Sequence, residues 1–84
     1  MNEKMLKTMV DAAAVKRARI IANGARFHVV VDAPGRIFTV ETGKGAVRTW
    51  TSIDSAAKWL RGLGIGHVVL ELAHWAPGQR SLLP

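Results

Sequence analysis

At 84 residues, with 49% hydrophobic and 21% charged side chains, the chain has the composition of one small globular domain and is too apolar for a disordered segment. It contains no cysteine, which excludes a disulfide framework and a thiolate zinc site. The formal charge of +6 is compatible with nucleic acid, an acidic protein or an anionic membrane surface as partner, or with charge that serves solubility alone. The opening segment lacks the apolar run of a signal peptide, and no later run approaches the ~18 residues of a membrane span, so we expect a cytoplasmic protein.

The first predicted element is an amphipathic helix from Glu3 to about Ala14. Its apolar residues recur at helical spacing and are Met5, Leu6, Met9, Val10 and Ala13. The segment offers no good N-cap and contains several flexible methionines. We expect an ordinary helix laid against a sheet, with ordering against a partner as the alternative.

Two interpretations fit the next segment, "IIANGARFHVVVD", because Asn23-Gly24 can either end a long helix or turn a hairpin. The β-branched pair Ile20-Ile21 and the period-two alternation after the turn favour the hairpin. Turns at residues 32–35 and 43–45 then separate "RIFTVET" from "AVRTWT". This pattern predicts a four-stranded antiparallel meander over residues 17–51.

A second amphipathic helix is predicted from residue 52 to residue 63. Ser52 is a suitable N-cap, and Asp54 lies in the first turn, where the helix dipole favours an anion. Gly64 falls at the left-handed position after the helix, and Ile65 is placed to contact Leu60, as a Schellman ending requires. "HVVLEL" then predicts a final strand near residues 66–72.

These elements predict an α+β fold in which an N-terminal helix, a four-stranded antiparallel meander, one amphipathic helix and a final strand follow one another (αββββαβ). We expect a single domain over residues 1–84. Its mobile parts are expected to be the N-terminal helix (about 3–14) and the C-terminal tail (about 74–84).

No catalytic constellation is visible in the sequence. The histidines His28, His67 and His74 lack the spacing of a metal-binding motif, and the carboxylates are scattered singly. "GKGAVRT" joins two predicted strands and opens no helix, so it does not fit a phosphate-binding loop. We expect a binding protein and not an enzyme, with no metal and no cofactor.

Basic residues gather around the predicted hairpins and are the candidates for nucleic-acid binding: Lys16, Arg17, Arg19, Arg26, Lys44 and Arg48. Strand alternation places Arg17 and Arg19 on one face, with Arg26 on the neighbouring strand. A row of cations on an edge strand also prevents edge-to-edge aggregation, and that interpretation weighs about equally.

The tryptophans and the tail are candidates for protein contacts. Trp50 and Trp59 are expected to seal the core, whereas Trp75 is either a lid on the core or an interface anchor. The candidate interface residues are Trp75, Leu82 and Leu83. Because one helix on one side of a sheet leaves edges uncovered, we also expect a homodimer.

At "RTWTSIDSAAKWLRGLGIG" and at "WAPGQR" the chain resembles the small ParC-type proteins encoded beside the ParA ATPase and the ParB centromere-binding protein of bacterial plasmid partition cassettes. The likeness extends from about Met9 to Arg80. It implies a non-catalytic accessory factor of DNA segregation whose partner is a ParA- or ParB-type protein, plasmid DNA or both, and no membrane. The family offers no residue-level motif of known role to carry over.

The alternatives to a partition role are a basic protein-interaction module and a small transcriptional regulator. The second is weaker, because no helix-turn-helix is visible in the sequence.

Overall fold

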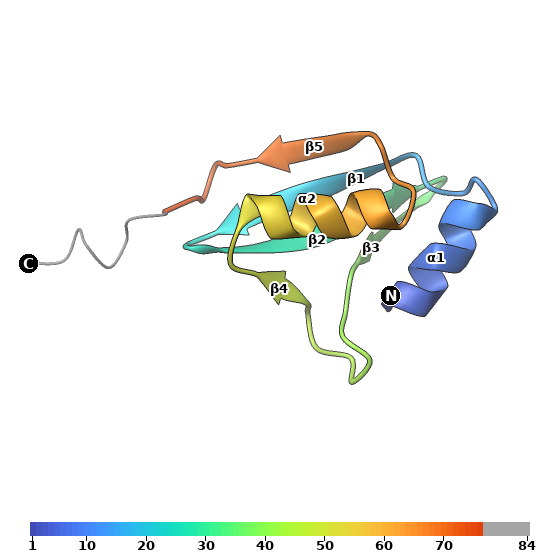
Figure 1. The fold of residues 1–84 in the computed structure, drawn as a ribbon, viewed down its shortest axis with the longest axis horizontal. Helices are drawn as coiled ribbons and strands as arrows, with labels where there is room; N and C mark the ends of the chain where they lie inside the picture. Colours follow the sequence, from blue (N-terminus) through green and yellow to red (C-terminus); the bar gives the residue numbers. More distant parts are fainter. Residues whose placement is uncertain (77–84) are drawn as a thin grey trace, which may run out of the picture.

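Figure 1 shows the computed structural model, which describes residues 1–76 as a five-stranded mixed sheet with two helices. The elements are α1 (Glu3–Asp11), β1 (Arg17–Asn23), β2 (Arg26–Ala33), β3 (Arg36–Thr39), β4 (Thr49–Trp50), α2 (Ile53–Gly62) and β5 (Val68–Glu71). The α+β class and the predicted order of elements are confirmed. Among these residues no helix is long and apolar enough to cross a membrane. The predicted interface residues Leu82 and Leu83 lie outside the described residues.

The hairpin interpretation of "IIANGARFHVVVD" is confirmed by the antiparallel pairing of β1 with β2. Asn23 pairs with Arg26, so the loop consists of Gly24 and Ala25 and lies one residue later than the predicted Asn23-Gly24 turn. Gly24 has a φ of +66°, the sign that a type II′ turn requires at its first central residue, where glycine carries no steric cost.

The sheet has the order β3-β2-β1-β5, and β4 also pairs with β2. β4 does not return beside β3, as a simple meander would have it. β2 is eight residues long and β3 only four, so β3 pairs with one half of β2. β4 pairs with part of the other half of β2, on the same edge, and runs in the same direction as β3. Residues 40–48 leave the sheet between them as a loop, whose base is closed by a bond from the Arg48 N–H to the Val40 carbonyl (3.0 Å).

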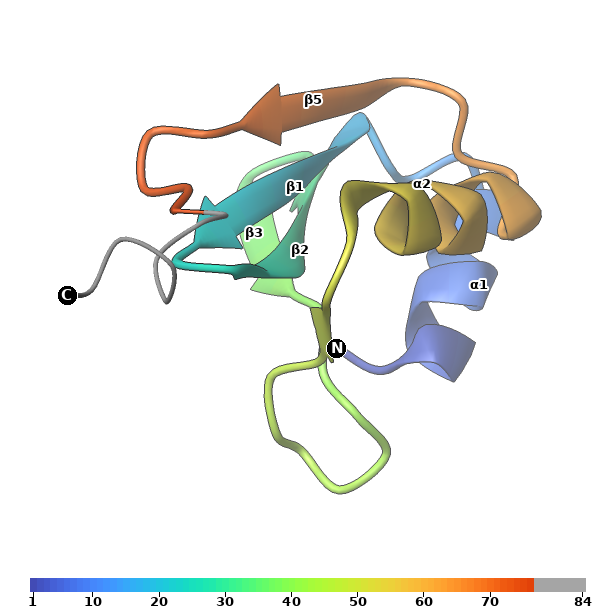
Figure 2. The ribbon, with the colours of Figure 1, turned by 60° about the vertical axis from the view of Figure 1, so that its left-hand side comes forward.

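Both helices lie on the same side of the sheet, as Figure 2 shows. The buried core between them and the sheet consists of Leu6, Ala18, Ile20, Ala22, Phe27, Val29, Val31, Val40, Ala56, Leu60, Leu63 and Ile65, with Trp50 and Trp59 packed against it. Within residues 1–76 no helix covers the opposite face, which we call the open face. Along β1 it carries Arg17, Arg19 and Ile21, which alternate with the buried residues.

The helix α1 is anchored more firmly than its sequence suggests. The Asn2 side chain caps it by accepting the Met5 N–H at 2.9 Å, a cap that the sequence interpretation missed. Leu6 is completely buried in the core, so the apolar stripe of α1 packs against its own domain.

The helix α2 has the predicted Schellman ending. The Ile65 N–H donates to the Leu60 carbonyl (3.1 Å) and the Gly64 N–H to the Arg61 carbonyl (3.0 Å), while Gly64 takes a φ of +96°. Leu60 and Ile65 are both buried, which supplies the apolar contact of the motif.

The helix α1 also ends in a Schellman motif, but an alanine takes the left-handed position that Gly64 takes after α2. The Ala14 N–H donates to the Met9 carbonyl (2.9 Å) and the Ala13 N–H to the Val10 carbonyl (3.0 Å). Ala13 has a φ of +56°, the left-handed region that costs a residue with a Cβ roughly 1–2 kcal/mol. The predicted helix to Ala14 therefore stops at Asp11, and Ala13 is a strained cap.

We predict that Gly64→Ala destabilises the protein by about 1 kcal/mol or more. The new Cβ would lie in a left-handed residue and 3.4 Å from Val10 Cγ1. Urea unfolding measures the effect. The matched control is Gly43→Ala, where no neighbouring atom lies within 4 Å and φ is not positive, so an equal loss in both variants would contradict the prediction.

The complementary change, Ala13→Gly, should stabilise the protein by roughly 0.5–1 kcal/mol, because glycine relieves the left-handed strain at some cost in unfolded-state entropy. The same urea titration measures it. Ala12→Gly, one residue earlier and at a negative φ, serves as the control and should destabilise. A destabilised Ala13→Gly protein would show that the cap carries no strain.

Candidate binding surface

The carboxylates of the sequence all lie within residues 1–76, and each forms an ion pair inside the chain. The pairs are Glu3–Arg48, Lys7–Asp11, Arg17–Asp32, Arg19–Asp32, Arg19–Glu71, Asp54–Lys58 and Glu41 with the N-terminal amine. Among the described residues, the cations with no carboxylate partner are Lys4, Lys16, Arg26, Arg36, Lys44 and Arg61. The surplus of positive charge is therefore displayed on the surface and is not neutralised locally.

On the open face, Arg17 and Arg19 of β1 share the carboxylate of Asp32 on β2. Arg17 Nε donates to Asp32 Oδ2 at 2.8 Å, and Arg19 Nη2 donates to Oδ1 at 2.9 Å. Arg19 also donates to Glu71 of β5 at 3.2 Å, so its guanidinium joins three strands. Hydrogen bonds from Arg17 and then Arg19 lower the pKa of Asp32 below its ordinary value. Arg17 keeps half of its side chain exposed, whereas Arg19 is mostly covered.

Arg48 lies on the helix side of the sheet, away from Arg17 and Arg19. Its guanidinium stacks 5.1 Å from the ring of Trp50 and 4.8 Å from that of Trp59 and bonds to Glu3 at 3.1 Å. Trp59 Nε1 donates to the same Glu3 oxygen at 2.9 Å, and these two bonds lower the pKa of that carboxyl. These contacts join the loop 40–48 to Glu3 of α1 and Trp59 of α2, so Arg48 helps to hold the fold together.

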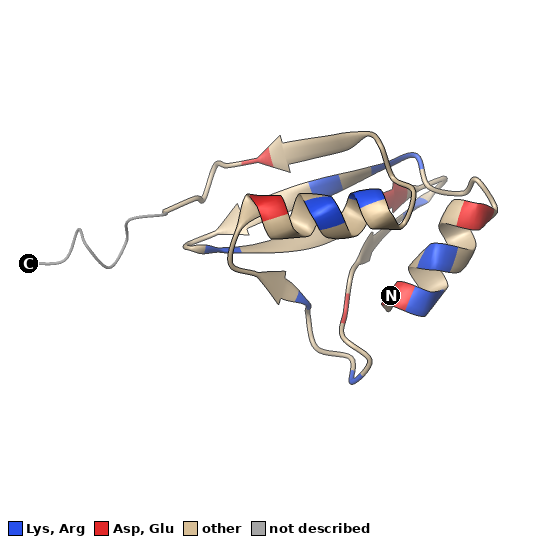
Figure 3. Cartoon of the chain, in the orientation of Figure 1, with Lys and Arg blue, Asp and Glu red and all other residues tan. Residues whose placement is uncertain are grey.

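The other predicted cations are spread over the molecule. Arg26 lies on the open face with Arg17 and Arg19, but at the opposite end of the sheet, beside the hairpin turn. Lys16 precedes β1, and Lys44 lies midway along the loop 40–48. Figure 3 shows lysine and arginine positions distributed over both helices, the sheet and this loop. The six predicted cations therefore do not make one contiguous patch. Their DNA-binding role stays a prediction.

Trp75 is held against the hairpin turn by two backbone bonds. The Gly24 N–H donates to the His74 carbonyl (2.9 Å), and the Ala76 N–H donates to the Gly24 carbonyl (2.8 Å). The indole packs on Phe27 with ring centroids 6.2 Å apart, so it is a lid on the core, but 39% of the residue remains exposed.

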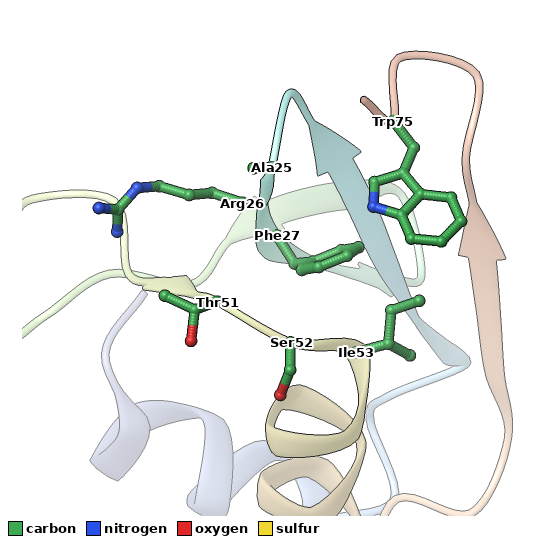
Figure 4. Close-up of a pocket in the computed structure, with 7 residues that line it drawn as sticks. All are labelled: Ala25, Arg26, Phe27, Thr51, Ser52, Ile53 and Trp75. Atoms are coloured by element: carbon green, nitrogen blue, oxygen red, sulfur yellow. The ribbon is translucent and has the colours of Figure 1, made fainter. Parts of the chain in front are cut away.

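Trp75 also borders a hollow of about 450 Å³ at the start of α2 (Figure 4). Its lining residues are Ala25, Arg26, Phe27, Thr51, Ser52, Ile53 and Trp75. Nothing in the local sequence indicated that these segments meet, because the contact depends on the pairing of residues 74–76 with the turn.

The histidines do not form a metal centre with other residues of the described chain. Within residues 1–76, no three His, Cys, Asp or Glu side chains come together in a group that could hold a metal ion. His28 lies on the open face of β2, His67 precedes β5 and His74 lies beside the hairpin turn.

The described residues thus define a small basic α+β domain with helices on one side of its sheet. The ParC-like family matches residues 1–79, and the chain belongs to this family. This confirms, at the level of the family, the resemblance seen in the sequence. No curated protein and no solved structure matches the chain significantly.

The pairing of Asp32 predicts an acid-dependent loss of stability. Since the folded-state pKa of Asp32 is lowered, its carboxylate stabilises the fold above the unfolded pKa of about 3.9 and loses this effect as the pH falls below it. Asp32→Asn should therefore flatten the decline of the urea midpoint between about pH 5 and about pH 3.

The control is Asp54→Asn, which removes a largely exposed pair with Lys58 and should change the decline less. An unchanged decline in Asp32→Asn would contradict the assignment.

Proposed function

We propose that this protein is a non-catalytic accessory factor of bacterial plasmid partition that acts by binding DNA. The membership in the ParC-like family supports the partition context. The observation that carries the DNA-binding part is the internal pairing of every carboxylate, which leaves the surplus cations without local neutralisation. Such a surface attracts the phosphate backbone by releasing its counterions.

The residues best placed for phosphate contacts are those that keep their charge accessible. Lys16, Arg26 and Lys44 are exposed and have no carboxylate partner among residues 1–76, and Arg17 is half exposed. Arg19 and Arg48 are held by their intramolecular partners and contribute less. Contacts of this kind give affinity with little reading of sequence. Both helices pack an apolar stripe against the core, and they do not form a helix-turn-helix, because four strands separate them along the chain.

A second candidate is docking on a ParA- or ParB-type protein through Trp75. The observation that favours it is the exposed part of an indole beside a hollow, because aromatic anchors of this kind dominate protein interfaces. The helix α1, the other docking candidate, already packs Leu6 into its own core. In this version the positive charge steers association and does not contact DNA.

The salt dependence of duplex binding tests the DNA proposal. With three to four phosphate contacts, the log-log slope of affinity against salt should be roughly −3 to −4. The triple variant Lys16→Glu, Arg26→Glu and Lys44→Glu should abolish binding at about 150 mM salt and keep the fold, since exposed charges contribute little to stability.

The matched control is Lys4→Glu, Arg36→Glu and Arg61→Glu, which removes the same charge from the other unpartnered cations. Equal loss in the two triple variants would contradict the assignment to the named residues. If the protein shows no DNA binding at this salt but is retained on a ParA or ParB column, and Trp75→Ala releases it, the docking function replaces the DNA function.

A further inference from the structure

The two edges of the sheet are built differently. The edge formed by β3 and β4 is interrupted by the loop 40–48, and its first residue is the charged Arg36. Interruption and charge are the features by which proteins protect an edge from pairing. The other edge, β5, reads Val-Val-Leu-Glu without lysine, proline or bulge, and within residues 1–76 no strand pairs with its outer side.

β5 also exposes apolar side chains. Leu70 pairs with the buried Ile20 of β1 and therefore lies on the helix side of the sheet, yet it is 42% exposed. Leu72, just after the strand, is 40% exposed. This end of the domain presents free strand hydrogen-bonding groups together with apolar side chains.

The hydrogen bonds to β1 determine which groups of β5 point outward. The Ala18 N–H donates to the His67 carbonyl, and in a parallel ladder alternate residues bond to the same neighbour. Val69 and Glu71 therefore bond towards β1, like His67. The N–H and carbonyl groups of Val68 and Leu70 point away from the sheet.

We propose that the chain forms a homodimer by antiparallel pairing of β5 with β5 of a second copy. Around a two-fold axis perpendicular to the sheet, each side chain keeps its face, so His67, Val69 and Glu71 can face only one another on the open face. Two sheets then join into one continuous sheet, with all helices on the same side. The inference does not depend on DNA or on a partition partner.

Two observations select the register and favour a second copy as the occupant. The Leu72 carbonyl already accepts the Trp75 N–H at 3.0 Å, so the ladder ends at Glu71 and is centred on Val69. In that register Val68 forms hydrogen-bonded pairs with Leu70 of the copy, which covers the exposed leucine. His67 falls opposite Glu71 of the copy, so this register brings no two like charges together across the two-fold axis.

Disulfide trapping tests the register, because the chain has no natural cysteine. Paired Val69 residues would lie about 4.5 Å apart at Cα, within the roughly 4.4–6.8 Å range that a disulfide spans. Val69→Cys should therefore form a covalent dimer rapidly with copper–phenanthroline, whereas Leu70→Cys should form it slowly. Ile37→Cys, exposed on the other edge, is the control. Equal rates at positions 69 and 37 would overturn the proposal.

Sedimentation equilibrium tests the edge without a covalent bond. Leu70→Lys should raise the dimer dissociation constant about tenfold or more, because it places a charge in an apolar pairing. The fold should persist, since Leu70 is already partly exposed, and circular dichroism checks this. Ile37→Lys should leave the constant unchanged. A monomeric wild type at about 100 μM, or a dimer insensitive to Leu70→Lys, would overturn the proposal. The partner of the β5 edge would then be an extended segment of another protein.

A charge swap tests the predicted cross-strand pair. His67→Glu should weaken the dimer, and adding Glu71→His should restore part of the affinity when compared with Glu71→His alone, which already lacks the intrachain bond to Arg19. The two residues lie four positions apart in one strand, about 13 Å, so their coupling within a chain is weak. Absence of any rescue would contradict the register.

Discussion

The antiparallel ladder between β1 and β2 is the constraint on which the rest of the molecule depends. β3 and β4 pair with β2, β5 pairs with β1, and residues 74–76 pair with the Gly24 turn that joins the two strands. Because side chains alternate along these strands, the register of this one hairpin decides which residues enter the core and which face outward. The positions of Asp32 between two arginines and of Trp75 on Phe27 both follow from it.

The elements with a complete local signal were predictable from the sequence. The glycine after α2, the N-cap Ser52 and the alternation after Gly24 each reflect a conformational need of adjacent residues. The pairing of β4 was not predictable, because two residues carry no periodicity and their partner is chosen by the half of β2 that β3 leaves free. The left-handed conformation of Ala13 was not predicted either, because alanine favours a continuing helix and its presence does not indicate a cap.

The candidate site shows the same division between local and long-range information. The net charge follows from composition, and alternation placed Arg17 and Arg19 on one face of their strand. Which cations are neutralised depends on contacts between distant segments: Glu71 with Arg19, and Glu3 with Arg48. Folding thus divides the basic residues into some that hold strands and helices together and others that remain accessible to an anionic partner. A count of charges along the chain cannot make that distinction.

The loop 40–48 makes β3 and β4 two pieces of one edge strand separated by an insertion. The loop begins and ends at the same point, where the Val40 carbonyl accepts the Arg48 N–H, and Val40 is in turn fixed to the Val29 carbonyl. Its length is therefore uncoupled from the path of the sheet, because lengthening it displaces neither strand and costs only slowly growing closure entropy. A fluorescent reporter or a short epitope inserted beside Lys44 would leave the hairpin register and the β5 edge as they are.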